Sequence, residues 1–171
     1  MFFLLFLQEP LKAPLLSSVS SKRNIKLACA LSQGIMRAMG DYPSKKDWIE
    51  HAIAVIEEGI HTEDLRDELY CQLMKQLLSN ARKESVEHGW WLMSLCLTSF
   101  SPSERLFPYL RQFLIHWQPA VQSNDNIFQS LAETSADLLD RTRVNGTRVH
   151  PPTALEFDCL MVRVFRCFHE I

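Results

Sequence analysis

The stretch LRDELYCQLMKQ, residues 65–76, decides the fold class that this sequence predicts. Four leucines within it and directly after it recur at every fourth position: Leu65, Leu69, Leu73 and Leu77. Residues four positions apart lie on the same side of an α-helix, so the leucines form one apolar stripe. Tyr70 and Met74 widen the stripe. The spacing therefore predicts a helix whose leucine side faces a core.

The charged residues on this helix do not have the spacing of a catalytic pair. Asp67 and Glu68 are adjacent, which places them about 100° apart around a helix. Two carboxylates that act as acid and base must converge on one substrate. We therefore expect Arg66, Asp67 and Glu68 to pair with neighbouring helices. We expect Gln72 and Gln76 to hydrogen-bond to backbone at loop ends.

The rest of the chain also has helical periodicity, with apolar residues at three- and four-residue steps. Runs of alternating polar and apolar residues, typical of strands, are missing. Helices are predicted over the ranges 21–40, 44–59, 62–78, 85–100, 101–117, 127–139 and 155–168. The helix over 85–100 is apolar on most sides and is expected to lie deep in the bundle. The sequence thus predicts an all-α fold, a compact multi-helix bundle of about seven helices.

Local signals predict where several helices begin and end. The expected N-caps are Ser20 or Ser21, Ser44, Thr62 and Ser101, and the expected stops are Gly40 and Gly59. Ser44 with Asp47 three residues later has the spacing of a capping box. In SPSE, residues 101–104, Pro102 suits the first helical position and Glu104 can reach back to the cap. The stripe expected to face the core in that helix includes Tyr109.

Composition excludes several classes of function. The chain has 171 residues, of which 47% are hydrophobic and 22% charged, as is usual for one globular domain. Its formal net charge is −2, so its overall charge favours neither nucleic acid nor an anionic membrane. Any electrostatic partner must therefore bind a local patch. We expect no nucleic-acid partner and no membrane insertion.

The cysteines and the first residues indicate a cytoplasmic protein. The five cysteines lie in apolar helix-like segments without CxxC spacing, which predicts buried free thiols in a reducing compartment. The start, MFFLLFLQEP, is apolar for only seven residues, too short to cross a membrane. It lacks the basic start and cleavage site of a signal peptide. We expect it to lie over the domain or to be the cut edge of a larger protein.

Signatures of enzymes are absent from the sequence. It contains no GxSxG, GxxxxGK[ST], HExxH or GxGxxG motif. The six histidines and five cysteines do not cluster with the spacing of zinc ligands. The sequence therefore predicts no catalytic residues, no cofactor and no metal.

Two long segments carry a family resemblance. LRDELYCQLMKQLLSN, residues 65–80, and GWWLMSLCLTSFSPSERLFPYLRQFL, residues 89–114, resemble the myosin tail homology 4 domain. PLKAPLL at 10–16, MGD at 39–41 and GTRVHPPTALE at 146–156 follow in the family's order. The resemblance covers roughly residues 9–156. Two positions depart from it, because family members often have proline where this chain has Ala81 and Ser101.

The resemblance implies a non-catalytic helical bundle. The family occurs in tails of unconventional myosins, in a plant calmodulin-regulated kinesin, in adaptors with pleckstrin-homology domains and beside a Rho-GTPase-activating domain. A FERM domain usually follows it, and members bind microtubules or the cytoplasmic tails of membrane receptors. We accordingly divide the chain into an apolar N-terminal segment (1–8), the domain (9–156) and a C-terminal helical extension or link (157–171).

Tubulin tails are acidic, so binding to them requires a basic patch. Three groups of basic residues are candidates: Lys22, Arg23 and Lys26; Lys45 and Lys46; and Arg141, Arg143 and Arg148. The first two groups start successive predicted helices, and they lie at opposite ends if those helices are antiparallel. The third surrounds the loop near Gly146. Each group could equally be a solvated helix end.

Two hypotheses on function remain open from the sequence. In the first, the chain is a cytoplasmic, cytoskeleton-associated module that binds microtubules or receptor tails through basic patches, together with a FERM domain. In the second, it is a structural packing unit that stabilises an adjacent FERM or Rho-GTPase-activating domain and binds no filament itself.

Overall fold

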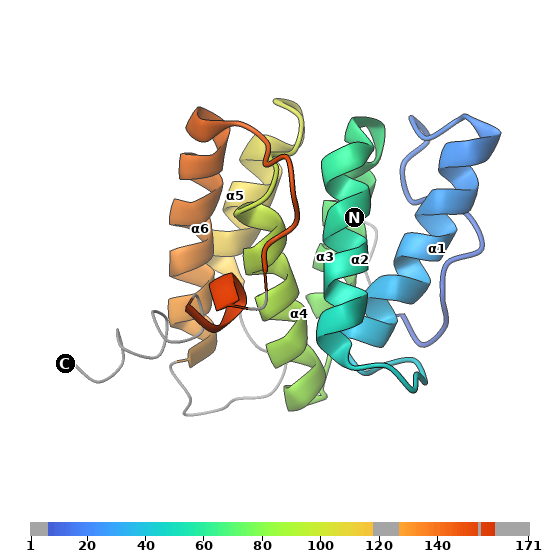
Figure 1. The fold of residues 1–171 in the computed structure, drawn as a ribbon, viewed down its shortest axis with the longest axis horizontal. Helices are drawn as coiled ribbons and strands as arrows, with labels where there is room; N and C mark the ends of the chain where they lie inside the picture. Colours follow the sequence, from blue (N-terminus) through green and yellow to red (C-terminus); the bar gives the residue numbers. More distant parts are fainter. Residues whose placement is uncertain (1–6, 118–126, 154, 160–171) are drawn as a thin grey trace.

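The computed structural model describes residues 7–117, 127–153 and 155–159 (Figure 1). These residues contain six α-helices and one short 3₁₀ helix, and no strand forms among them. The helices are α1 (Lys22–Ala38), α2 (Trp48–His61), η1 (Glu63–Leu65), α3 (Arg66–Leu77), α4 (Lys83–Leu97), α5 (Phe107–His116) and α6 (Ile127–Asn145). A short helical turn follows at 155–159. The predicted all-α bundle of about seven helices is confirmed.

Helix α4 is the centre of the bundle. It packs against α1, α2 and α3 on one side and against α6 on the other, while α5 packs on α6 (Figure 1). The chain runs down α1 and back up α2, so these two neighbours are antiparallel (Figure 1). Eleven of the 15 residues of α4 are buried, which confirms its predicted place deep in the bundle.

Aromatic side chains join α4 to α5 and to the turn at 155–159. Trp90 is fully buried, with Phe113 stacked 6.2 Å from it and Trp117 edge-on at 5.0 Å, measured between ring centroids. Trp91 is 1% exposed and meets Phe157 edge-on at 6.0 Å. The four leucines of the 65–77 stripe are 0–1% exposed, as their spacing predicts. Burial of large apolar side chains is the main force holding such a bundle together.

Both ends of α1 follow local sequence signals. The Ser21 hydroxyl accepts a hydrogen bond from the backbone N–H of Asn24 at 3.0 Å, so Ser21 is the N-cap. Gly40 has a φ of +78°, and its N–H donates to the carbonyl of Arg37 at 3.1 Å. Glycine takes this left-handed conformation at little cost, which explains the predicted stop.

The predicted ends of α2 are wrong. The N-cap is Asp47, whose carboxylate accepts from the N–H of Ile49 at 2.9 Å, and Ser44 lies in the preceding turn. Gly59 does not end the helix, which continues to His61. A Cβ at Gly59 would lie 2.3 Å from the ring of Phe100, so this glycine allows an aromatic ring to pack on the helix.

Thr62 was predicted to cap the following helix, and the structure corrects this prediction. Its side chain makes no cap hydrogen bond; its hydroxyl donates instead to the carboxylate of Glu58 at 2.5 Å. The chain passes through the short helix η1, and its last residue, Leu65, is fully buried. Burial of this leucine ties the start of α3 to the core.

The predicted start of α5 is also wrong. The helix begins at Phe107, with Pro108 in its first turn, and Ser101 is not its cap. Ser103 supplies a local bond, since its hydroxyl accepts from the N–H of Leu106 at 3.3 Å. Tyr109 was predicted to face the core but is 70% exposed, because Phe107, Leu110 and Leu114 form the buried stripe.

Helix α6 extends beyond its predicted end at Leu139 and reaches Asn145. Gly146, with a φ of +83°, follows it. The chain then returns along α4, where the N–H of Arg148 donates to the carbonyl of Ser99 at 2.8 Å. Of the helix predicted over 155–168, only residues up to 159 lie within the described ranges; residues 1–6 also lie outside them. Among the described residues, no helix has the length and apolarity that a membrane span requires.

Candidate binding surfaces

The polar side of α3 holds other parts of the chain in place. Glu68 is fully buried, and its two carboxylate oxygens accept from the N–H groups of Leu15 and Leu16, each at 2.8 Å. Gln72 donates to the same carboxylate at 2.7 Å and to the carbonyl of Ala28 at 3.0 Å. Glu68 therefore fixes the segment before α1, whereas the sequence predicted a partner on a neighbouring helix.

Asp67 holds a different segment. One carboxylate oxygen accepts from the N–H of Ser103 at 2.7 Å, and the other accepts from the Ser103 hydroxyl at 2.6 Å. This residue fixes the turn before α5, again in place of the predicted helix partner. Hydrogen bonds to ionised carboxylates are stronger than neutral ones, so both turns are firmly held.

Arg66 and Gln76 complete this polar side. The guanidinium of Arg66 donates to the carbonyls of Gly59 and Ile60, at 2.9 and 3.1 Å, at the end of α2. Gln76 donates to the carbonyl of Leu7 at 3.2 Å, which is the predicted bond to loop backbone. Gln72 instead bonds to the carbonyl of Ala28 within α1. All these contacts are with the protein's own backbone or side chains, so the geometry gives this face a structural role.

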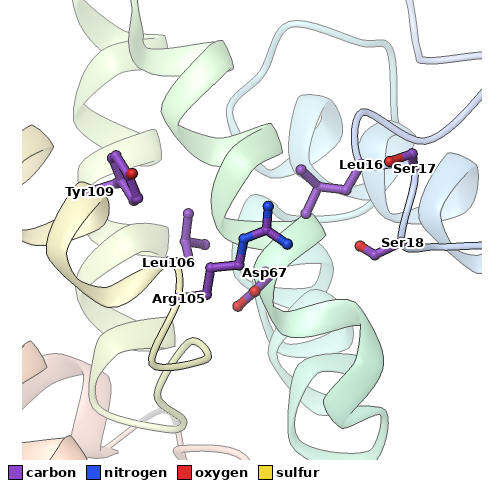
Figure 2. Close-up of a pocket in the computed structure, with 7 residues that line it drawn as sticks. All are labelled: Leu16, Ser17, Ser18, Asp67, Arg105, Leu106 and Tyr109. Atoms are coloured by element: carbon purple, nitrogen blue, oxygen red, sulfur yellow. The ribbon is translucent and has the colours of Figure 1, made fainter.

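The two segments held by Asp67 and Glu68 form the walls of an open groove (Figure 2). The groove has a volume of about 230 Å³ and is lined by Leu16, Ser17, Ser18, Asp67, Arg105, Leu106 and Tyr109. A second cavity of about 460 Å³ shares Ser18 and Asp67 with it. The second cavity is acidic on balance, since Glu63, Asp64 and Glu104 also line it, against the single positive charge of Arg66. The sequence pattern alone did not reveal this groove, because its walls are about 50 and 36 residues away from α3 along the chain.

The first basic group lies on the first two turns of α1. Lys22, Arg23 and Lys26 are all exposed, and none forms an ion pair within the ranges that the structure describes. Lys22 and Lys26 are four residues apart and share one side of the helix. This group is available for an acidic partner.

The second basic group lies in the turn before α2, not in the helix as predicted. Lys45 and Lys46 are exposed, and the Lys46 ammonium lies 3.6 Å from the carboxylate of Glu50. Figure 1 shows the turn over 40–47 at the opposite end of the bundle from the start of α1. The expectation of two separate small patches therefore agrees with this arrangement.

A histidine lies beside the second group. The Nε2 atom of His51 lies 2.6 Å from the hydroxyl of Ser44, which also accepts from the N–H of Lys46 at 3.0 Å. Burial, and then the positive charges of Arg37 and Lys46, lower the pKa of His51 below its ordinary value of 6.5. The environment of this histidine is therefore electropositive.

The third basic group is largely engaged within the molecule. Arg143 pairs with Glu104, and its guanidinium lies 4.3 Å from the centroid of the Phe107 ring. Arg148 pairs with Glu156. The backbone N–H of Thr153 and the paired Arg148 lower the pKa of Glu156. Arg141 alone in this group is exposed without an ion pair to a described residue.

The cysteines differ in exposure. Cys96 is buried, Cys29 and Cys71 are half-buried, and Cys159 is exposed, so the prediction of buried thiols is wrong for Cys159. Burial, followed by the charges of Glu68 and Asp67, raises the pKa of Cys71 to about 12. Cys167 lies outside the described residues. In the part of the chain that the structure describes, no three His, Cys, Asp or Glu side chains are grouped so that they could hold a metal ion.

The fold defines an all-α domain arranged around one buried central helix, and comparison with known proteins identifies its family. Residues 52–159 match the family model of the MyTH4 domain. The chain belongs to the MyTH4 domain family, the myosin tail homology 4 domain that the motifs at 65–114 predict. Its relatives are tails of unconventional myosins.

Two curated relatives show how much of a longer protein this chain covers. It is 32% identical over 168 residues to unconventional myosin-VIIb of Mus musculus, covering 95% of this chain and 7% of that protein. It is 33% identical over 167 residues to myosin-VIIa of Drosophila melanogaster, covering 96% of this chain and 7% of that protein. The chain thus spans about 7% of the length of these relatives.

Solved structures agree in fold. The human myosin 7b C-terminal MyTH4-FERM domain in complex with the harmonin-a PDZ3 domain aligns with a TM-score of 0.75 and 31% identity. That alignment covers 90% of this chain and 31% of the other. The MyTH4-FERM MF2 domain of Dictyostelium discoideum myosin VII aligns with a TM-score of 0.83 and 27% identity, covering 95% of this chain and 33% of the other.

Proposed function

We propose that this chain is a non-catalytic binding module of a motor tail or adaptor, cytoplasmic and cytoskeleton-associated, that binds acidic protein segments. The proposed partners are the tails of tubulin and the cytoplasmic tails of receptors. The observation that carries the proposal is the group Lys22, Arg23 and Lys26, exposed without an ion pair to any described residue. Lysines at a helix start oppose the helix dipole, so this placement lowers helix stability and favours another role for them.

The second basic group supports the same function at the other end of the bundle. Lys45 and Lys46 lie in the turn over 40–47, and the Lys46 ammonium forms an exposed pair with Glu50. Such exposed pairs contribute little, so an acidic partner competes with this one easily. Arg143 and Arg148 contribute less than the sequence suggests, because both already pair with carboxylates.

The proposal includes a FERM domain as a neighbour of the domain at 9–156. It is supported by the solved relatives, which are MyTH4-FERM units of which this chain covers about a third. The human myosin 7b unit was solved with a PDZ domain of harmonin-a, so a relative with this architecture binds a partner protein. The extension at 157–171 is the proposed link to that neighbour.

One observation favours the second candidate, a unit that packs against a neighbouring domain and binds no filament. Val144, Val149 and Leu155 are 85%, 74% and 72% exposed. They lie within 12 residues of one another, at the end of α6 and in the segment that follows it. Exposed apolar residues that gather in one region mark a surface for another protein or domain.

Microtubule co-sedimentation across a salt series tests the proposed function. Lys26→Glu and Lys45→Glu should each weaken binding severalfold, and the effect should shrink as salt rises. Arg141→Glu is the matched control, since it changes the net charge equally at an exposed residue that belongs to neither lysine group. Absence of sedimentation at low salt, from a chain shown by circular dichroism to be folded, would exclude autonomous filament binding. Equal losses in all three variants would show that only the overall charge matters.

A further inference from the structure

The groove beside α3 has walls that are already fixed in the unbound protein. Glu68 holds the backbone of Leu15 and Leu16, and Asp67 holds Ser103, directly before Arg105 and Leu106. Because the wall segments are already ordered, they lose little conformational entropy when a ligand binds. This arrangement distinguishes the groove from a chance gap between two mobile loops.

The groove has an apolar surface that stays exposed. Leu16 lies on one wall, and Leu106 and Tyr109 lie on the other (Figure 2). Tyr109 is 70% exposed although it is a large aromatic residue, and the core stripe of α5 does not use it. Tyrosine is enriched in protein interfaces because it combines an apolar ring with a polar end. An apolar side chain of a ligand can pack against Leu106 and Tyr109.

Arg105 supplies a charge next to this surface. Figure 2 shows its guanidinium extending into the space between Leu106 and Leu16. It is exposed and makes no hydrogen bond or ion pair to a residue in the described ranges. Asp67 lines the same groove, but both of its oxygens already accept from Ser103. The planar guanidinium matches a carboxylate, which can accept two parallel hydrogen bonds from it.

The acidic cavity beside the groove favours one orientation of a bound peptide. It shares Ser18 and Asp67 with the groove, and its four carboxylates, on Glu63, Asp64, Asp67 and Glu104, outnumber its one cation, Arg66. A peptide with acidic residues at that end would be repelled, whereas neutral or basic residues there would be accepted. The charges therefore favour one orientation of a bound chain.

We propose that this groove binds an extended peptide segment of a partner protein, with an apolar side chain against Leu106 and Tyr109 and an adjacent carboxylate on Arg105. The segment continues past Ser18 with neutral or basic residues. The surface uses none of the residues of the two lysine groups and goes beyond the function proposed above.

Selection of phage-displayed random heptapeptides on the immobilised protein tests this inference. Enriched sequences should share an apolar residue next to Asp or Glu, with no acidic residue on its other side. Synthetic versions of the enriched peptides are then titrated by fluorescence anisotropy. Arg105→Gln should weaken their binding roughly five- to tenfold, and Tyr109→Ser by a similar factor. Both residues are exposed, so both variants are expected to fold.

Arg141→Gln is the matched control, because Arg141 is also exposed and has no ion pair to a described residue. It should leave peptide binding unchanged. Selection that enriches no sequence, or enriches sequences without a carboxylate, would overturn the proposal. Equal losses of peptide affinity in Arg105→Gln and Arg141→Gln would also overturn the proposal, because peptide binding would then depend only on the overall charge of the protein. A failure of filament binding leaves these outcomes unaffected.

Discussion

Asp67 and Glu68 are neighbours in the sequence, yet their carboxylates hold two different segments of the chain. Asp67 binds Ser103 ahead of α5, and Glu68 binds the backbone of Leu15 and Leu16 ahead of α1. The 100° step between adjacent helical residues, which argues against a catalytic pair, is what lets one helix fix both walls of a groove.

The buried carboxylate of Glu68 is expected to matter for stability. Glu68→Gln replaces one oxygen by an NH₂ group, which cannot accept from a backbone N–H. The change should lower the free energy of unfolding by about 1–3 kcal/mol, because a buried N–H loses its partner. Urea denaturation followed by circular dichroism measures this loss. Glu57→Gln, at an exposed position of α2, is the control and should stay within about 0.5 kcal/mol. If Glu68→Gln lowered the free energy of unfolding as little as the control does, that result would contradict the role assigned to Glu68.

Gly59 lies under the ring of Phe100, and alanine there should destabilise the protein. Its Cβ would lie 2.3 Å from the ring, which is fully buried and has little freedom to move. Overpacking costs about 1–3 kcal/mol, more than the gain of about 0.5–1 kcal/mol from alanine in a helix.

Gly89→Ala is the matched comparison for this prediction. Its Cβ would also lie close to neighbours, 2.5 Å from Met39 and 2.8 Å from Leu77, but these atoms are the ends of flexible side chains. Thermal unfolding should therefore show a larger drop for Gly59→Ala than for Gly89→Ala. The reverse order would mean that the Phe100 ring can move aside.

The thiols should differ in reactivity according to burial. With a pKa of about 12, roughly one Cys71 side chain in ten thousand is ionised at pH 8. Alkylation by iodoacetamide, followed residue by residue by mass spectrometry, should modify the exposed Cys159 first and leave Cys71 and the buried Cys96 almost unmodified. The control is the urea-unfolded chain, in which these cysteines should react at similar rates. Rapid modification of Cys71 in the folded chain would contradict the structure.

His51 should titrate below its ordinary pKa of 6.5 in the folded protein. The unfolded chain then takes up the proton first as the pH falls. The contribution of His51 to stability is therefore complete above pH 6.5 and decreases as the pH falls from 6.5 toward the folded pKa. NMR titration of the ring proton measures this pKa. Lys46→Gln should raise it, because a nearby positive charge is removed, whereas Lys26→Gln should leave it unchanged. A midpoint at or above 6.5 would show that burial and the charges of Arg37 and Lys46 do not lower the pKa of this ring.

The sequence by itself determined the class, the family and the apolar framework. The four-residue spacing from Leu65 to Leu77 identified a buried stripe, and the apolar run from Ser85 onward identified the central helix. Ser21 and Gly40 were found because a cap and a left-handed stop depend on atoms a few residues away. Periodicity and short-range hydrogen bonds are properties of a local segment, so sequence reasoning can reach them.

The tertiary structure decided which local signals are used and what the polar residues do. Gly59 has the appearance of a residue that ends a helix. Instead, it leaves room for the ring of Phe100, which lies 41 positions further along the chain. Ser101 has the appearance of a cap, yet Asp67 holds Ser103 and the helix starts later. The contacts of Glu68 and the surroundings of Arg105 depend on segments that are distant in the chain and close in space. Only packing brings these segments together, because burying the leucine stripe requires the bundle to close while the buried carboxylate of Glu68 keeps its hydrogen bonds.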